Sequence, residues 1–420
     1  MKAYIHKSKI QGSITAPSSK SYTIRGLMCA ALASGESEIV HPLSSEDTEA
    51  AMNVLSKLGV GVHKEDDLWR VNGGDFHAPD TDLFCGDSAA TLRFMTAICA
   101  IVPGKCRLTA GPSLSRRPVK PLIAALQQLG IKCSAPGGLP PVTVEGGRLT
   151  GGVTQLPGDI SSQFVSALLF LAPFAEEGMI IRLTTPLESK PYVMMTLDCL
   201  QKFGITVGFS PALDQFEVVR QNYEPTKYEV EGDWSSASYF LALGALAGEV
   251  AVTNLNPASL QGDKIMINFL QDMGAAIEVG RDSVTVRKSR LKALRADLTD
   301  CIDLLPTVAV LAAMADGVSE LTGIARARLK ESDRVAAVKD GLIRMGIGVT
   351  EAQDKLTITG SKPQGAVIDS RGDHRLAMAF SVLGSVVGDT VIDDAECVAK
   401  TYPQFWDELK SIGGEVSYGQ

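Results

Sequence analysis

Residues 55–62 have the sequence LSKLGVGV, and this short pattern organises the whole chain. An apolar residue is followed by two mostly polar residues, a large apolar residue, a glycine and then small or β-branched residues. The pattern is typical of an amphipathic helix that ends at a glycine in the left-handed conformation and continues into a strand. It recurs at 126–133, 200–207, 270–277, 342–349 and 409–416.

The regular spacing of these copies predicts a sixfold repeat. The shared glycines are 71, 74, 70, 72 and 67 residues apart; they are Gly59, Gly130, Gly204, Gly274, Gly346 and Gly413. Each unit also contains a helix of nearly continuous small and apolar residues, which must be buried because it has no polar face. These helices are predicted at 26–33, 92–101, 164–172, 239–247, 307–315 and 376–387, each followed by a short loop and a strand.

Six units divide naturally into two domains of three. The polar segment 223–228 contains Pro225 and lies between the third and fourth copies, so we place the domain crossing there. One domain is predicted to be 13–226, and the other 1–12 together with 227–420. We expect the first dozen residues to pair with the sheets of the second domain, and the active site to lie in the cleft between the domains.

Composition excludes several classes of protein. The net charge of -8 argues against nucleic acid or an anionic membrane as partner. The eight cysteines include no CxxC pair, and no uncharged apolar run reaches the length of a membrane span, so we expect a cytoplasmic protein with reduced thiols. The five histidines lack metal-ligand spacing, which makes a zinc site unexpected and leaves only a carboxylate site open.

Polar residues precede every buried helix, in the segments 17–25, 86–93, 159–163, 233–238, 303–306 and 373–375. Serine and aspartate are ordinary helix caps. Capping alone does not explain why all six units have such a segment, or why several of the segments also contain a Lys, Arg or Gln. If the units are related by threefold quasi-symmetry, each domain directs three helix N-termini the same way and attracts anions.

A second charged cluster, 329–335, places Lys330, Glu331 and Arg334 at one predicted helix start near Lys330, with Ser332 or Asp333 as the cap. Such a cluster is ordinarily a solvated, ion-paired helix start. Further cations lie at Arg116, Arg117, Lys190, Arg371 and Lys400. Because arginine stays protonated, we assign Arg117, Arg334 and Arg375 to binding of a multiply anionic ligand. Proton transfer is assigned to titratable groups, namely Lys20, Lys330, Lys400, Asp303 and Glu331.

The sequence lacks the motifs that are typical of several enzyme classes. There is no GxxxxGK[ST] loop, no GxSxG elbow and no GxGxxG after a predicted strand. A P-loop kinase, a serine hydrolase of the elbow type and a Rossmann dehydrogenase are therefore disfavoured.

The segments 17–25, 161–163, 189–192, 330–334, 373–375 and 400–403 together resemble the 5-enolpyruvylshikimate-3-phosphate (EPSP) synthase family, in family order and over essentially the whole chain. The resemblance implies an α/β (α+β) fold of two similar domains, each of three βαβαββ repeats with buried helices, an inside-out α/β barrel. It implies transfer of the enolpyruvyl group of phosphoenolpyruvate to the 5-hydroxyl of shikimate 3-phosphate, through a tetrahedral intermediate that loses phosphate. This step of the shikimate pathway needs no metal or nucleotide cofactor, and a monomer is expected.

The resemblance also assigns roles by motif. Asp303 is the base for the 5-hydroxyl, and Glu331 with Lys20 handles the methyl proton. The shikimate 3-phosphate site is Lys20, Ser21, Arg25, Ser161, Ser162, Gln163, Ser189, Asp303 and Lys330. The phosphoenolpyruvate site is Lys20, Ala89, Arg117, Gln163, Arg334, Arg375 and Lys400.

Three positions depart from the family pattern. Ala89, followed by Ala90, stands where the family commonly has glycine, so its methyl group predicts reduced sensitivity to glyphosate. Arg326 stands where many relatives have an asparagine that contacts shikimate 3-phosphate, which leaves that contact open. Leu304 follows Asp303 where glutamate is frequent, and we interpret this as a packing change.

Two alternative functions are compatible with the same fold. The related enolpyruvyl transferase that acts on UDP-N-acetylglucosamine shares the fold, but the strings at 161–163 and 189–192 favour the shikimate branch. A noncatalytic anion-binding protein of the same fold predicts the loss of Asp303, Glu331 or Lys20, and all three are present.

Overall fold

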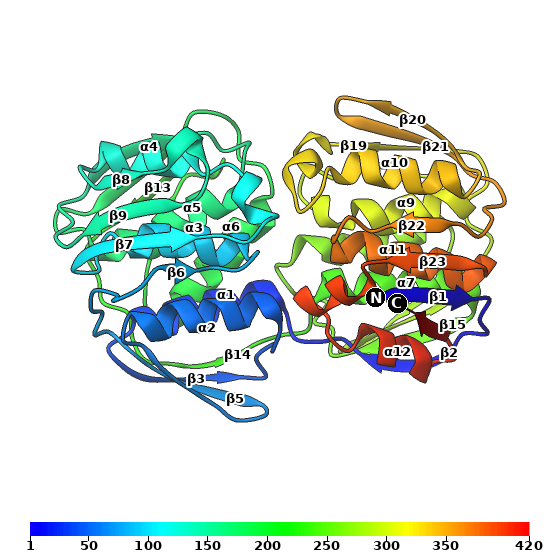
Figure 1. Ribbon diagram of the computed structural model, residues 1–420, viewed down its shortest axis with the longest axis horizontal. Helices are drawn as coiled ribbons and strands as arrows, with labels where there is room; N and C mark the ends of the chain where they lie inside the picture. Colours follow the sequence, from blue (N-terminus) through cyan, green and yellow to red (C-terminus); the bar gives the residue numbers. More distant parts are fainter. Residues whose placement is uncertain (420) are drawn as a thin grey trace. The chain divides into compact units, whose positions relative to one another are not determined.

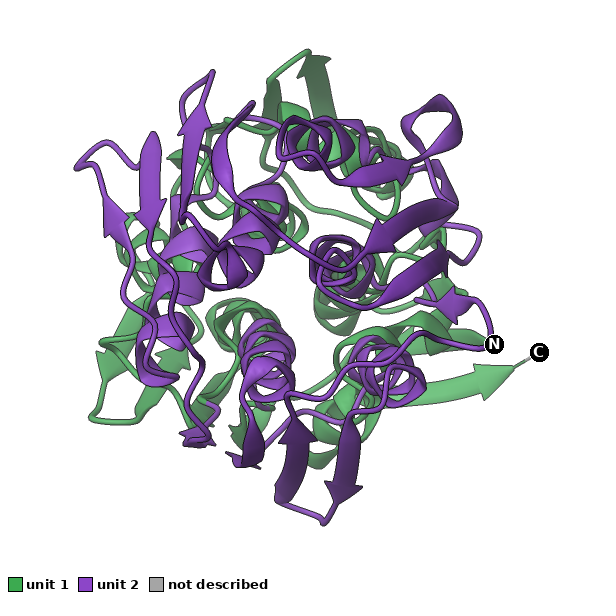
Figure 2. Cartoon of the chain, turned by 90° about the vertical axis from the view of Figure 1, so that its left-hand side faces the viewer, with its two compact units in different colours: residues 1–17, 231–420 green, residues 18–230 purple. Residues whose placement is uncertain are grey.

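The computed structural model describes residues 1–419 and separates into two compact units (Figure 1, Figure 2). Unit 1 is Met1–Pro17 with Glu231–Gln420, and unit 2 is Ser18–Val230. The crossings lie a few residues after the predicted ones because of strand pairing. Strand β2 (Gln11–Thr15) pairs in parallel with β15 (Glu249–Thr253) of unit 1, and β14 (Lys227–Glu229) pairs with β3 (Gly35–Val40) of unit 2.

Unit 2 contains three four-stranded sheets, each with one parallel pair and two antiparallel pairs. The first has the order β14-β3-β5-β4, the second β6-β7-β9-β8 and the third β10-β11-β13-β12. The remaining strands are β4 (Gly61–Lys64), β5 (Leu68–Gly73), β6 (Leu83–Phe84), β7 (Gly104–Thr109), β8 (Lys132–Ser134), β9 (Val142–Gly146), β10 (Gly152–Leu156), β11 (Met179–Leu183), β12 (Gly208–Phe209) and β13 (Gln215–Val218).

Unit 1 repeats this arrangement, with the sheets β16-β17-β15-β2, β18-β19-β21-β20 and β22-β23-β1-β24. The predicted pairing of the first residues with this unit is confirmed, since β1 (Lys2–His6) lies between β23 (Thr390–Asp393) and β24 (Glu415–Gly419). The other strands are β16 (Ala276–Val279), β17 (Ser283–Arg287), β18 (Arg295–Asp297), β19 (Val318–Thr322), β20 (Gly348–Ala352), β21 (Lys355–Thr359) and β22 (Val367–Asp369).

Six helices are buried on nearly all sides, as the sequence predicts. In unit 2 they are α1 (Lys20–Leu32), α3 (Ala89–Ile98) and α5 (Ser162–Leu171), and in unit 1 α7 (Trp234–Ala247), α9 (Leu305–Met314) and α11 (His374–Val387). Figure 2 shows the helices of unit 2 nearly end-on, with the strands outside them. The helices therefore form the interior of the unit, and the sheets cover it.

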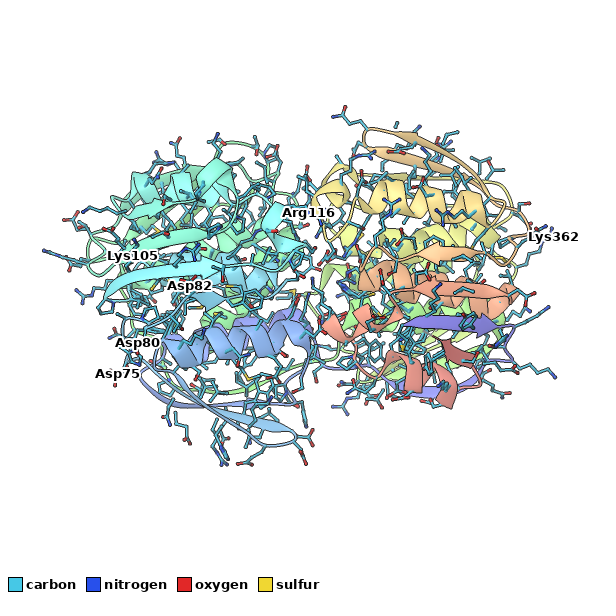
Figure 3. The ribbon with its side chains drawn as sticks, in the orientation of Figure 1. Asp75, Asp80, Asp82, Lys105, Arg116 and Lys362 are labelled. Carbon is cyan, nitrogen blue, oxygen red and sulfur yellow. The ribbon has the colours of Figure 1, made fainter. Side chains whose placement is uncertain are left out.

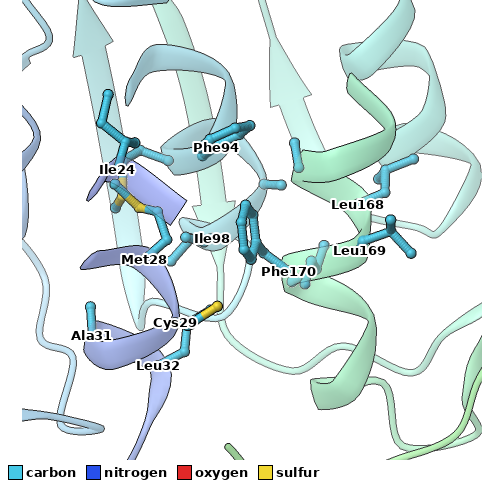
Figure 4. Packing of buried hydrophobic residues seen from close by; sticks show 14 of the residues in the cluster. Ile24, Met28, Cys29, Ala31, Leu32, Phe94, Ile98, Leu168, Leu169 and Phe170 are labelled. Carbon is cyan, nitrogen blue, oxygen red and sulfur yellow. The ribbon is translucent and has the colours of Figure 1, made fainter. Parts of the chain in front are cut away.

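Close packing holds the buried helices of unit 2 together (Figure 4). Phe94 of α3 meets Phe170 of α5 edge to face, with ring centroids 5.0 Å apart. Ile24 and Met28 of α1 and Ile98 of α3 belong to the same core cluster. Full burial of one such side chain contributes about 1.5–3 kcal/mol, so the core stabilises the three helix starts that carry the polar residues.

The amphipathic helix of each repeat ends next to its glycine. These helices are α2 (Glu46–Lys57), α4 (Lys120–Gln128), α6 (Lys190–Lys202), α8 (Met266–Asp272), α10 (Arg334–Arg344) and α12 (Phe405–Ser411). All six repeat glycines have positive φ, between 80° at Gly130 and 99° at Gly59, which confirms the left-handed helix ends. Two similar units of three repeats confirm the predicted fold class; within residues 1–419 the strands form six separate sheets. None of the described helices has the length and apolar character needed to cross a membrane.

Candidate active site

The centre of the unit 1 cluster is Arg334, the first residue of α10, whose side chain is 1% exposed. Its guanidinium donates to three carboxylates: Nη1 to Asp303 at 2.8 Å, Nη2 to Glu331 at 2.6 Å and Nε to Asp373 at 2.8 Å. Asp333, one of the two predicted caps, caps the helix by accepting from the Ala336 amide. The helix begins at Arg334 and not near Lys330, because the aspartate cap defines its first turn.

Three further cations surround the same carboxylates. Lys330 Nζ lies 3.2 Å from Asp303 Oδ1, and Arg375 Nη2 lies 3.4 Å from Asp303 Oδ2. Lys400 Nζ lies 3.5 Å from Glu331 Oε1. The structure thus brings together all the predicted site residues of this unit, which come from four separate segments.

The charges of the cluster determine its protonation. Burial alone would raise the pKa of Asp303, but the charges of Arg375, Lys330 and Arg334 hold it well below its ordinary value. Burial also disfavours the charged form of Arg334, whereas Asp373, Glu331 and Asp303 raise its pKa above the ordinary value. Asp303 is therefore ionised beside a permanently charged arginine, which is the protonation state that a general base requires.

Asp373 does more than cap a helix, which is the only role that the sequence predicts for it. Its fully buried carboxylate accepts from Arg334 Nε at 2.8 Å and Nη2 at 3.1 Å, from Ser332 Oγ at 3.0 Å and from the Arg375 amide at 3.0 Å. Asp373 therefore orients the side chain of Arg334 and the backbone of Arg375, the two predicted binding arginines that it contacts. An aspartate directly before a cationic helix start was the only signal in the sequence.

In the unit 2 cluster, the buried Arg25 bonds to neutral oxygen atoms. Arg25 of α1 is 2% exposed; it donates from Nε to Thr196 Oγ1 at 2.9 Å, and from Nη1 and Nη2 to the carbonyls of Ser21 at 3.0 Å and Tyr192 at 3.1 Å. Burial lowers the pKa of Arg25 from its ordinary value. Lys20, at the start of the same helix, donates to Asp47 at 3.0 Å.

Arg93 of α3 links two predicted binding residues, although the sequence interpretation did not assign it to the site. Nη1 donates to Ser161 Oγ at 3.1 Å and to Gln163 Oε1 at 2.8 Å, and the guanidinium lies 4.8 Å from the centroid of the Phe164 ring. Ser161 caps α5, which explains why Ser162 and Gln163 begin the helix. The position of Arg93 at the end of the polar segment 86–93 was the available signal.

The remaining predicted residues of unit 2 lie at turns and helix starts. Arg117 is 7% exposed, whereas its neighbour Arg116 is exposed (Figure 3). Ser189 precedes α6 with a left-handed backbone, φ 53°. Ala89 is the first residue of α3, directly after the Ser88 cap, and is buried.

The structure also shows the contacts of Leu304 and Arg326, the two other residues that depart from the family pattern. Leu304 is fully buried in the core of unit 1. Arg326 lies in the 3₁₀ helix η6 (Ala325–Leu329) and donates from Nη2 to the Thr299 carbonyl at 2.6 Å. Within residues 1–419, no group of three or more His, Cys, Asp or Glu side chains is arranged to hold a metal ion.

Comparison with known proteins identifies the family. The model of the family described as EPSP synthase (3-phosphoshikimate 1-carboxyvinyltransferase) matches residues 5–409. This chain belongs to the EPSP synthase family. A relative named 3-phosphoshikimate 1-carboxyvinyltransferase, from Dehalococcoides mccartyi, is 51% identical over 418 residues and 99% of each chain. One of the same name from Methanocaldococcus jannaschii is 41% identical over 97% of each chain.

Solved structures of EPSP synthases have the same fold. The EPSP synthase of Acinetobacter baumannii superposes with a TM-score of 0.83 at 27% identity, over 99% of this chain and 100% of that one. The enolpyruvyl transferase NikO of Streptomyces tendae superposes with a TM-score of 0.80 at 18% identity, over 100% of this chain and 98% of that one, which shows the fold alone. The EPSP synthase fold thus carries both residue clusters described above.

Proposed function

We propose that this chain is a 3-phosphoshikimate 1-carboxyvinyltransferase of the shikimate pathway. It transfers the enolpyruvyl group of phosphoenolpyruvate to the 5-hydroxyl of shikimate 3-phosphate and releases phosphate. Membership of the EPSP synthase family and the names of the relatives support this activity. The geometric observation that most directly supports this activity is the ionised Asp303, which lies between Arg334, Lys330 and Arg375.

The unit 1 cluster suits an addition followed by an elimination. Asp303 accepts the proton of the 5-hydroxyl as its oxygen attacks C2 of phosphoenolpyruvate, while C3 gains a proton and becomes a methyl group. Loss of a methyl proton and cleavage of the bond between C2 and the phosphate oxygen then give the enol ether and phosphate. Glu331, bonded to Arg334 and close to Lys400, is proposed to handle the methyl proton together with Lys20.

Arg334, Arg375 and Lys400 are proposed to bind the anionic groups of phosphoenolpyruvate, together with Lys20, Ala89, Arg117 and Gln163. Arginine suits this task because it presents several donors in a fixed plane. The charge of Arg334 also stabilises negative charge that develops on the substrates in the transition state.

Shikimate 3-phosphate is proposed to bind Lys20, Ser21, Arg25, Ser161, Ser162, Gln163, Ser189, Asp303 and Lys330. Arg25 supports this proposal because its protein partners are uncharged. Its positive charge is therefore not cancelled locally and can attract a phosphate group. That residues of both units serve the same substrates stays a prediction.

The cellular setting is part of the proposal. The partners are two small anionic substrates, with no nucleic acid, no membrane and no bound cofactor, and the protein works as a monomer. The cytoplasm is the proposed compartment, where thiols stay reduced. All eight cysteines are free, and burial raises the pKa of the Cys85 thiol to about 12, which keeps it unreactive.

The test is phosphate release from phosphoenolpyruvate, measured in chelator and without nucleotide. Shikimate 3-phosphate and UDP-N-acetylglucosamine are offered separately as acceptors. We expect release only with shikimate 3-phosphate. Release only with the sugar nucleotide would assign the chain to the other branch of enolpyruvyl transferases, and release with neither would contradict a transferase role.

A further inference from the structure

Asp263 is a buried carboxyl group that the proposed chemistry does not use. It lies in the 3₁₀ helix η4 (Gly262–Ile265) of unit 1 and is 2% exposed. Its Oδ2 accepts a hydrogen bond from Ser235 Oγ in the first turn of α7. Its Oδ1 is buried and has no hydrogen-bond partner among the described residues. A buried carboxylate oxygen without a partner is costly when ionised, so its surroundings favour a neutral carboxyl.

The backbone around Asp263 is held firmly. The Gln261 side chain donates to the Gly232 carbonyl at 2.8 Å and accepts from the Trp234 amide at 3.0 Å. Lys264, next to Asp263, donates to the Ser259 carbonyl. These bonds tie η4 to the start of α7, where Ser235 donates to Asp263.

The charged groups that act on Asp263 come from three packed elements. Asp303 of η5 (Ile302–Leu304) and Asp233, the cap of α7, disfavour its ionisation, whereas Arg375 of α11 favours it. Burial, Asp303 and Asp233 together raise the pKa of Asp263 to about 7, against the lowering by Arg375 and the Ser235 hydrogen bond. Asp263 in turn contributes to raising the pKa of the Cys301 thiol, which burial holds well above its ordinary value.

Asp263 and Arg375 contact α7 one turn apart: Ser235 donates to Asp263, and Arg375 Nη1 donates to Tyr239 Oη at 3.4 Å. Because positions four residues apart share one face of a helix, Asp263 lies on the side of α7 that faces the guanidinium contacted by Asp303. Two carboxylates near one another do not ionise equally, and their environments separate an ionised member from a protonated one. Asp303 is the ionised member, since it also receives Lys330 and Arg334. Its contact with Arg375, at 3.4 Å, is the loosest of the three and the one that a second negative charge would disturb.

We propose that Asp263 is a positioning residue for Arg375, whose neutral carboxyl leaves that guanidinium to Asp303 and to the anionic substrate. Ionisation of Asp263 adds a buried negative charge, draws Arg375 toward η4 and weakens substrate binding. The inference rests on the proposed function in one respect, namely that Arg375 binds an anionic group of phosphoenolpyruvate.

The pH dependence of KM for phosphoenolpyruvate tests this role in the full chain, between pH 6 and 8.5 with saturating shikimate 3-phosphate. For the wild type we expect KM to rise about fivefold above pH 7, the order of magnitude for one added charge several ångströms away. Asp263→Asn stays neutral, so its KM should lack this rise. The substrate phosphate itself titrates near pH 6, but equally for both proteins, so the difference between the two curves isolates Asp263. The same rise in both would overturn the inference.

Ser235→Ala provides a second variant with an opposite effect. The Ser235 hydrogen bond lowers the pKa of Asp263, so its removal should move the rise in KM to higher pH and not abolish it. A rise that stays at the wild-type pH would contradict the role of Asp263.

Thermal unfolding separates this inference from the proposed function. An acid whose pKa is higher in the folded than in the unfolded protein stabilises the fold while protonated. That contribution is present below the ordinary value near 3.8 and is lost as pH rises through about 7. The Tm of Asp263→Asn relative to wild type should therefore increase from pH 5.5 to pH 8. Absence of turnover in the wild type would refute only the proposed function, whereas parallel Tm curves would overturn the inference about Asp263.

Discussion

In unit 1 the buried Arg334 is surrounded by carboxylates, whereas in unit 2 the buried Arg25 and Arg93 bond to hydroxyl, amide and carbonyl oxygens. The first arrangement nearly balances positive and negative charge and keeps Asp303 ionised in a buried place. In the second arrangement the hydrogen-bond partners of Arg25 are uncharged and leave its positive charge uncancelled. We therefore propose that the same repeat architecture places the base for the 5-hydroxyl in unit 1 and, through Arg25, an anion-binding guanidinium in unit 2.

This difference teaches that burial alone does not determine what an arginine does. Arg25 and Arg334 are both almost wholly buried, but burial lowers the pKa of Arg25 while three carboxylates raise that of Arg334. A guanidinium that already has anionic partners organises those partners in addition to any ligand that it binds. A guanidinium with neutral partners retains its attraction for a ligand anion.

The largest expected effect comes from Asp303→Asn. Removing the base should lower kcat for phosphate release about 10²- to 10⁴-fold, the usual contribution of general base catalysis. KM for phosphoenolpyruvate should not rise, because the surrounding cations lose an anionic partner. Steady-state kinetics with both substrates measures these quantities.

Asp47→Asn removes a carboxylate from the unit 2 cluster and is the control for Asp303→Asn in unit 1. Asp47 pairs with Lys20 at 3.0 Å, so its removal should lower kcat less than the removal of Asp303. An equal loss in the two variants would contradict the division between a chemical and a binding cluster.

Arg25→Lys tests the binding cluster. A lysine cannot reproduce three donors in one plane, and we expect the Kd for shikimate 3-phosphate to increase about 10- to 100-fold. Isothermal calorimetry measures the affinity directly. The control is Arg182→Lys, an exposed arginine that also bonds to a neutral oxygen, that of Gln215 at 3.1 Å. A similar loss in both would assign the effect to general charge and not to the buried site.

Arg117 and Arg116 form an adjacent pair with opposite exposure. Arg117→Ala should raise KM for phosphoenolpyruvate roughly tenfold or more, because a hydrogen bond to a charged group contributes about 1.5–3 kcal/mol. Arg116→Ala should change KM less than about twofold, as expected for an exposed side chain. Equal effects on KM would argue against a direct role for Arg117.

The smallest expected effect concerns inhibition. Ala89 begins α3 and is buried, so wild-type activity should be weakly inhibited by glyphosate. Ala89→Gly should lower the inhibition constant about tenfold, the lower range for one methyl group in a pocket. Inhibition is measured against phosphoenolpyruvate. A low-micromolar constant for the wild type would refute the proposed effect of the methyl group.

Much of this protein could be predicted from local patterns. The repeated glycine marks helix ends because only a left-handed residue closes them there, and wholly apolar helices must be buried. The polar segments before those helices identified Asp303, Arg375 and Lys20 as candidates, since capping residues do not ordinarily include cations.

Contacts between segments could not be predicted in this way. The bonds of Lys20 to Asp47, of Arg93 to Gln163 and of Arg334 to Asp373 join residues 27, 70 and 39 positions apart, and they depend on how neighbouring repeats pack. The start of α10 at Arg334 likewise depended on whether Ser332 or Asp333 became the cap.

The sequence by itself therefore determined the number of repeats, the buried helices, the family and the chemical types available to the site. The tertiary structure decided which partner each charged group received, and hence that Asp303 is ionised while the pKa of Asp263 is raised to about 7. The physical reason is that periodicity and capping act within one turn or one strand. Protonation, in contrast, depends on burial and on charges brought together from distant segments.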